Sequence, residues 1–140
     1  MAKIELSRGS GDYGFEATDE YGHTIKMDSS PESGGLNYGV RPMQMLLMGL
    51  AGCSAIDVIA ILKKQRQEVR DYKMVVNGDR EPNKEPSLWK EINIEFHLYG
   101  DIDPDKAQKA ADLSIGKYCS VAATLVKAGA EIKYKVFVHP

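Results

Sequence analysis

Residues 42–67 read PMQMLLMGLAGCSAIDVIAILKKQRQ, and this stretch decides the fold. Its first part is apolar on every side, which is typical of a helix that is buried all round. At ~1.5 Å per residue such a helix would run roughly 39 Å, more than a domain of this size needs. Cys53 stands in its middle among small residues such as Gly49, Gly52 and Ser54. The sequence therefore predicts a central buried helix that carries a thiol.

The composition is that of a soluble globular protein with a single domain over residues 1–140. Hydrophobic residues make up 43% and charged residues 27% of the chain, and the formal net charge of -2 argues against a nucleic-acid partner. The first eleven residues contain no apolar run, so no signal peptide is expected. Asp57 and then Lys63 and Lys64 follow the apolar run closely, which argues against a membrane span. We expect a cytoplasmic protein, in which cysteines are more often chemical than structural.

Strands and two further helices surround the central helix. Alternating apolar residues predict strands, and an Asp-Pro-Asp start at Asp103 predicts a helix over 103–115. A short second helix is expected over 120–128, ended by Gly129. The predicted strands cover residues 3–8, 13–18, 22–28, 70–78, 89–99 and 131–139. The order β-β-β-α-β-β-α-α-β predicts an α+β fold with antiparallel sheets around the long helix.

The segment 28–41 is long for a loop in a compact domain and rich in Ser, Gly and Pro. Loops of this length are usually functional or disordered. A flexible connector and a lid or substrate-lining loop are both consistent with it.

The apolar surface of the central helix needs more cover than one chain offers. One sheet can cover one side of the helix, which leaves the apolar residues of the other side in water. A homodimer that buries two such helices against each other is the simplest solution.

Cys53 and Cys119 are the only cysteines, and 66 positions separate them, so they form no CxxC motif. Free cysteines are often inert core residues, and that interpretation stays open for both. Cys119, however, follows Lys117 and begins a predicted helix, where the dipole and the cation would favour the reactive thiolate. Asp57, one turn after Cys53, would disfavour the Cys53 thiolate if its carboxylate lies nearby.

The other polar residues predict no familiar site. His23, His97 and His139 lie where a solvated side chain is the expected outcome. Two cysteines and a histidine could bind zinc in principle, but no pair has a supporting local spacing, so no metal is predicted. The chain also lacks GxGxxG, P-loop and HExxH motifs, so no organic cofactor is expected.

The long helix, together with KYCSVAATLVKAGAEIKYKV at residues 117–136, resembles the OsmC/Ohr superfamily of thiol peroxidases. The resemblance extends through the element order to nearly the whole chain. It implies an intertwined α+β homodimer with two central helices and with active sites at the subunit interface.

The resemblance also implies a mechanism. Cys53 would attack an organic hydroperoxide and become a sulfenic acid, and Cys119 would close a disulfide that a dithiol reductant reopens. An apolar pocket from Met45, Met48, Leu50 and Ile56 would favour organic over hydrogen peroxide.

Lys26, Arg41 and Gln44 are candidates to support the reactive cysteine. Peroxidases of the superfamily use a Glu just after the helix-opening proline, where this chain has Met43 and then Gln44. They also use an Arg on the strand before the long loop, where this chain has Lys26. Lysine supplies charge without the bidentate fork of arginine, and Arg41 is a candidate substitute.

The sequence thus predicts a thiol-dependent peroxidase that reduces organic hydroperoxides through Cys53 and Cys119 in oxidative-stress defence. The alternative is a non-catalytic relative that binds a small apolar or thiol-containing ligand in the dimer-interface pocket. Loss of the Glu at positions 43 and 44 motivates this alternative. A structural dimer with two inert cysteines is the third possibility.

Overall fold

The computed structural model describes all residues, 1–140, and the chain divides into two compact units. The first unit covers Met1–Leu46 and the second covers Leu47–Pro140. The single domain expected over residues 1–140 stays a prediction.

The first unit contains the predicted antiparallel meander. β1 (Ile4–Ser10), β2 (Gly14–Asp19) and β3 (Thr24–Met27) form a three-stranded sheet with β2 in the centre. Both pairings are antiparallel, as the short Gly-containing turns predict. Apolar side chains of this sheet are not buried within the unit: Ile4, Leu6 and Ile25 are 66%, 57% and 48% exposed. Ile25 therefore faces no core within this unit.

The segment 28–41 is held in place by one buried carboxylate. Asp28 is 2% exposed and accepts hydrogen bonds from the backbone amides of Ser29 (2.7 Å), Leu36 (3.0 Å) and Tyr38 (3.1 Å). A 3₁₀ turn, η1 (Pro31–Ser33), lies inside the loop, and a β-bridge joins Met27 to Val40 near its end. The segment therefore forms an organised loop, and its role as a lid or substrate-lining loop stays a prediction.

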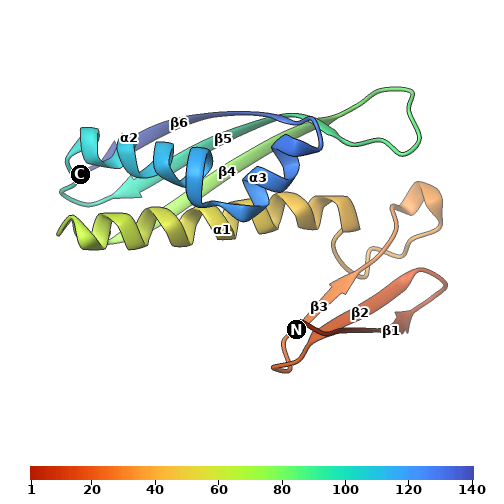
Figure 1. The fold of residues 1–140 in the computed structure, drawn as a ribbon. Coiled ribbons are helices and arrows are strands. Elements are labelled where there is room, and N and C mark those ends of the chain that lie inside the picture. Colours follow the sequence, from red (N-terminus) through yellow and green to blue (C-terminus); the bar gives the residue numbers. More distant parts are fainter. The chain divides into compact units, whose positions relative to one another are not determined.

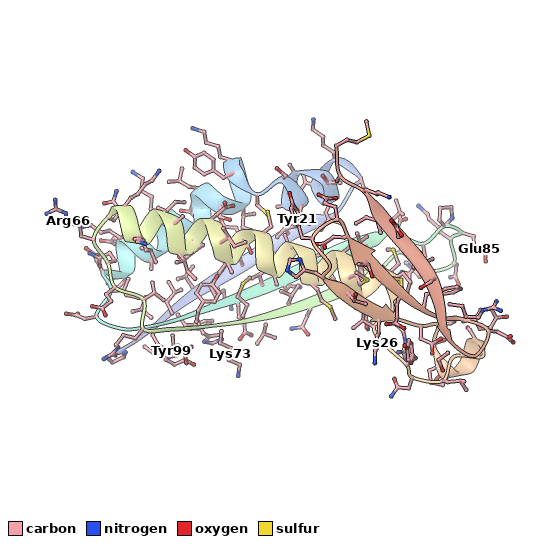
Figure 2. All side chains as sticks on the ribbon, turned by 90° about the horizontal axis from the view of Figure 1, so that it is seen from below. Tyr21, Lys26, Arg66, Lys73, Glu85 and Tyr99 are labelled. Carbon is pink, nitrogen blue, oxygen red and sulfur yellow. The ribbon has the colours of Figure 1, made fainter.

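In the second unit the helices lie on one face of a sheet formed by β4 (Asp71–Arg80), β5 (Trp89–Tyr99) and β6 (Glu131–His139). Figure 1 shows α1 (Pro42–Lys64), α2 (Pro104–Leu113) and α3 (Ser120–Lys127) along this face, and only the part of α1 from Leu47 belongs to the unit. The core forms between these layers, with the buried β5 residues Ile92, Ile94, Phe96 and Leu98 at its centre. Lys73 and Tyr99 lie on the opposite face, away from α1 (Figure 2).

The prediction of antiparallel sheets is wrong for one strand pair. β4 pairs with β5 in the antiparallel sense, but β5 and β6 are parallel over the whole length from Glu91 to Tyr99. The physical reason is the connection: α2 and α3 carry the chain back to the end of the sheet where β5 began. Such a helical crossover is the usual connection between parallel strands.

α1 buries one face. Its fully buried residues, Leu50, Ser54, Val58 and Leu62, recur every fourth position and face the sheet. Leu46, Met48, Ile56 and Ile59 are 43%, 51%, 70% and 41% exposed. The expectation that this helix is buried on every side is therefore wrong for a single chain. The expectation that the sheet covers one side of it is confirmed.

By length and composition alone α1 could cross a membrane, despite Asp57. Only 22% of its most apolar window is buried in the chain. A core helix of a soluble protein passes the same test, so this property assigns no location.

Candidate thiol site

Two segments that are distant in the sequence bring three reactive groups together. Cys53 and Asp57 lie one turn apart on α1, so their side chains share one face of the helix. Cys119 lies at the start of α3, beyond the whole of β4, β5 and α2. The sulfur atoms of the two cysteines and a carboxylate oxygen of Asp57 all lie within 4.8 Å of one another.

A π-helical turn positions Cys119. The sequence predicts that the helix starting at Asp103 stops near Gly116, but η2 (Ser114–Tyr118) continues it as a π-helix. The Cys119 amide donates to the Ser114 carbonyl oxygen at 2.8 Å, which closes this wide turn. The side chain of Cys119 then caps α3, because the Ala122 amide donates to its Sγ at 3.4 Å. Short π-helical segments are frequent at functional sites.

Ser114 also ties η2 to Asp57. Its hydroxyl donates to Oδ2 of Asp57 at 3.0 Å and lies 3.4 Å from the Ser54 carbonyl oxygen on the same helix. Ser114 itself is fully buried. One side chain therefore fixes the carboxylate of Asp57 and links the helix that carries Cys53 to the turn that precedes Cys119.

The two cysteines differ in accessibility. Cys53 is half-buried, whereas Cys119 is 2% exposed. A molecule arriving from solvent therefore reaches Cys53 before it reaches Cys119.

The pKa of the Cys119 thiol is raised to about 11, and burial is the largest cause. The neighbouring Cys53 contributes in the same direction, whereas the amides of Ala122 and Val121 at the start of α3 oppose the shift. Lys117 does not help, because its ammonium lies over the Tyr118 ring, 5.2 Å from the centroid. The start of α3 thus favours the Cys119 thiolate, as expected, but desolvation of the buried sulfur is the larger effect and the net shift of its pKa is upward.

A cavity of about 430 Å³ reaches Asp57, the only member of this cluster that lines it. Asp57 lines it together with residues of α1 and of the segment that leads to Cys119: Ala60, Ile61, Leu113 and Tyr118. The pocket that the resemblance places around Met45, Met48, Leu50 and Ile56 at a subunit interface stays a prediction. Leu50 is fully buried, and Met48 and Ile56 are exposed in the chain alone.

The predicted supporting residues lie in the first unit. Lys26 (Figure 2) is on β3 with its ammonium 5.0 Å from the centroid of the Tyr38 ring. Arg41 precedes α1 and donates to the Gly39 carbonyl oxygen at 3.1 Å. Gln44 is an exposed residue near the start of α1. Both cysteines belong to the second unit, so a supporting role for these three residues stays a prediction.

The structure adds two residues to the site. Sequence reasoning left open whether Asp57 points toward Cys53, and the structure places its carboxylate beside both sulfurs. Ser114 was missed altogether. Its only signal in the sequence is its position five residues before Cys119, the spacing of a π-type hydrogen bond.

The histidines lie outside this cluster. His23 is exposed and contacts Asp19. His97 is 2.9 Å from His139 and 3.0 Å from Glu95, and it stacks on Phe137. The expected solvated position is therefore right for His23, whereas His97 is packed in an aromatic cluster on the sheet.

Comparison with known proteins identifies the family. The family model for OsmC-like proteins matches residues 33–135. Protein YhfA of Escherichia coli K12 is 44% identical over 108 residues, which is 76% of this chain and 77% of that protein. A hypothetical protein from Aquifex aeolicus has a solved structure that is 34% identical, with a TM-score of 0.81 over 100% of this chain and 98% of that chain.

A more distant solved structure has the same fold. It is an organic hydroperoxide resistance protein OsmC from Legionella pneumophila, 14% identical, with a TM-score of 0.68 over 100% of this chain and 97% of that chain. At this identity the likeness shows the fold alone. The family model and the E. coli relative together show that the chain belongs to the OsmC-like protein family.

Proposed function

We propose that this protein is a thiol-dependent peroxidase that reduces organic hydroperoxides in oxidative-stress defence. The observation that carries the proposal is the meeting of a half-buried and a buried cysteine, with their sulfurs within 4.8 Å of each other. A peroxidatic cysteine needs access to its substrate, and its sulfenic acid is safe from overoxidation only when a second thiol is within reach.

The first step belongs to Cys53, the accessible thiol. Its thiolate attacks the terminal oxygen of the hydroperoxide, the O–O bond breaks, and the alkoxide leaves as an alcohol after taking a proton. Cys53 is then a sulfenic acid. The cavity beside Asp57 offers apolar side chains, Ile61, Leu113 and Tyr118, for the carbon chain of the peroxide.

The second step belongs to Cys119. Its thiolate attacks the Cys53 sulfur, the S–O bond breaks as the disulfide forms, and the hydroxide leaves as water after taking a proton from solvent. The sulfurs must approach to the ~2.05 Å of a disulfide bond. Oxidation of Cys53 favours this step, because it removes the Cys53 thiolate charge that helps to raise the pKa of Cys119. A dithiol reductant then reopens the disulfide by thiol exchange.

Supporting parts of the proposal concern assembly and location. A cytoplasmic homodimer would cover the exposed side of α1, and Lys26, Arg41 and Gln44 would contribute to the site from the first unit. Organic hydroperoxide resistance proteins of L. pneumophila and Bacillus subtilis have the same fold. None of the proposed steps requires a metal or an organic cofactor.

Stopped-flow oxidation of the reduced, chelator-treated protein by cumene hydroperoxide tests the proposal. We expect rapid loss of two thiols per chain. The Cys53→Ser variant should not react, and Cys119→Ser should accumulate sulfenic or higher acids at Cys53. Oxidation no faster than that of a free thiol would contradict the peroxidase.

The second candidate is a non-catalytic protein that binds a small apolar or thiol-containing ligand. The cavity of about 430 Å³ beside Asp57 favours it, as does the absence of a carboxylate at positions 43 and 44. Slow oxidation in the stopped-flow experiment, with saturable binding of an apolar thiol, would select this candidate.

A further inference from the structure

We propose that the reduced protein binds one zinc-like divalent cation per chain through Cys53, Asp57 and Cys119. The proposal goes beyond peroxide reduction, and it is independent of that activity. It starts from the three ligand atoms that lie within 4.8 Å of one another, two of them sulfurs and one a carboxylate oxygen.

The spacing suits a tetrahedral metal. Zinc binds sulfur at ~2.3 Å and carboxylate oxygen at ~2.0–2.2 Å, so neighbouring ligands of a tetrahedral site lie about 3.5–3.8 Å apart. Separations no greater than 4.8 Å therefore need to close by about 1.3 Å at most. Cys53 and Asp57 already share one face of α1 as an i, i+4 pair. Cys119 completes the set from the start of α3.

The sequence predicts no metal because no pair among its cysteines and histidines has a supporting local spacing. The histidines lie elsewhere in the structure, two of them on β5 and β6. The fold supplies Asp57 instead, because η2 brings Cys119 back to the turn of α1 on which Asp57 lies.

The atoms around the cluster also suit a metal site. Carboxylates that bind metals are usually held by a further hydrogen bond, and the buried Ser114 hydroxyl donates to Oδ2 of Asp57 at 3.0 Å. The Ala122 amide donates to the Cys119 sulfur at 3.4 Å, which supports a thiolate there. Asp57 lines the cavity of about 430 Å³, so a cation can approach this ligand from that side.

The charge and the softness of the ligands select the metal. Fully deprotonated, the cluster carries three negative charges, and the ion pairs in the structure leave Asp57 and both cysteines without a cationic partner. A divalent cation offsets this charge and lets both thiols lose their protons to the buffer. Two thiolates select zinc or cobalt over magnesium or calcium, which prefer oxygen ligands.

Cobalt titration of the reduced, metal-free protein under anaerobic conditions tests the proposal. Co²⁺ bound by two thiolates gives sulfur-to-cobalt charge-transfer absorption and the visible bands of a tetrahedral complex. We expect both signals to saturate at one equivalent per chain and to disappear when zinc is added. No peroxide is present, whereas the peroxidase assay contains chelator, so either proposal can fail without the other.

Variants distinguish this site from adventitious binding. Cys53→Ser and Cys119→Ser should each lose most of the charge-transfer signal. Asp57→Asn, which nearly preserves shape, should weaken binding by about tenfold or more. Asp101→Asn, at an exposed carboxylate between β5 and α2, is the matched control and should bind as tightly as the parent. Absence of charge-transfer absorption in excess cobalt, or undiminished binding by correctly folded Cys53→Ser protein, would overturn the proposal.

Discussion

At the residue scale, the carboxylate of Asp57 lies within 4.8 Å of both sulfurs. Its hydrogen-bond donor is the Ser114 hydroxyl, which brings no positive charge to the cluster. A negative charge at this distance disfavours a second one by about 1–4 kcal/mol, depending on solvent screening. We therefore expect an ionised Asp57 to slow reactions of Cys53.

The Asp57→Asn variant should therefore react faster at Cys53. Asparagine can still accept the Ser114 hydrogen bond, and removal of the charge favours the thiolate, so we expect alkylation by iodoacetamide at pH 7 to accelerate by roughly three- to tenfold. Metal-free protein is required, and Asp101→Asn is the control. Cys119 contributes little to this measurement because it is 2% exposed. A slower reaction would mean that the carboxylate assists the thiolate by accepting its proton.

The buried Cys119 thiol predicts a loss of stability at high pH. Its pKa is raised from 9.0 to about 11 in the folded chain, so between these values the unfolded chain loses a proton that the folded chain keeps. The free energy of unfolding therefore contains a contribution that is complete below pH 9 and declines as the pH rises toward 11.

Comparison with the Cys119→Ala variant isolates this contribution. Urea unfolding of the reduced protein from pH 8 to 11 should show that the parent loses up to about 3 kcal/mol more than Cys119→Ala. Lysines and tyrosines titrate in the same range in both proteins, so only the difference between them reports on Cys119. Parallel pH profiles would show that Cys119 is more solvated than its 2% exposure indicates.

At the element scale, the loop between β3 and α1 depends on one side chain. Three backbone amides, Leu36 first, lower the pKa of Asp28 more strongly than its burial raises it, and the net shift is downward. The carboxylate is thus favoured in the folded chain, and its contribution to stability is present at neutral pH. That contribution is lost as the pH falls through the lowered pKa.

The Asp28→Ala variant should release this loop. It leaves the amides of Ser29, Leu36 and Tyr38 without their acceptor, so limited proteolysis should cut within residues 29–40 several-fold faster than in the parent. Glu32→Ala is the matched control, because Glu32 is an exposed carboxylate in the same loop. Equal cleavage of both variants would show that the 3₁₀ turn and the Met27–Val40 bridge hold the loop without Asp28.

Local patterns in the sequence predict elements well and their contacts poorly. Strict alternation of apolar and polar residues correctly predicts the bounds of β5 and β6, and Asp103-Pro104 correctly predicts the start of α2. The parallel pairing of β5 with β6 and the π-helical η2 escape such patterns, because each depends on how α2 and α3 pack against the sheet. The family resemblance predicted the two cysteines of the thiol site. The sequence did not predict the contacts of Asp57 and Ser114, because these form only when η2 packs against α1.

At the scale of the whole molecule, apolar surface remains to be covered. α1 exposes Leu46, Met48, Ile56 and Ile59, and the first sheet exposes Ile4, Leu6 and Ile25. Soluble proteins rarely leave so many large apolar side chains in water without a partner. A second copy of the chain presents the same surfaces, and two α1 helices that pack together would cover each other.

The homodimer can be tested on the most exposed apolar residue of α1. Ile56 is 70% exposed, so Ile56→Glu changes little within one chain but would bury a charge in the proposed interface. We expect the parent to sediment with twice the 15.5 kDa mass of the chain, and Ile56→Glu to sediment as a monomer or to dissociate at least 100-fold more readily. Tyr21→Glu, at a residue that is 79% exposed in the turn between β2 and β3, is the control and should remain dimeric. A monomeric parent at micromolar concentration would contradict the dimer, and the exposed face of α1 would then require a different partner.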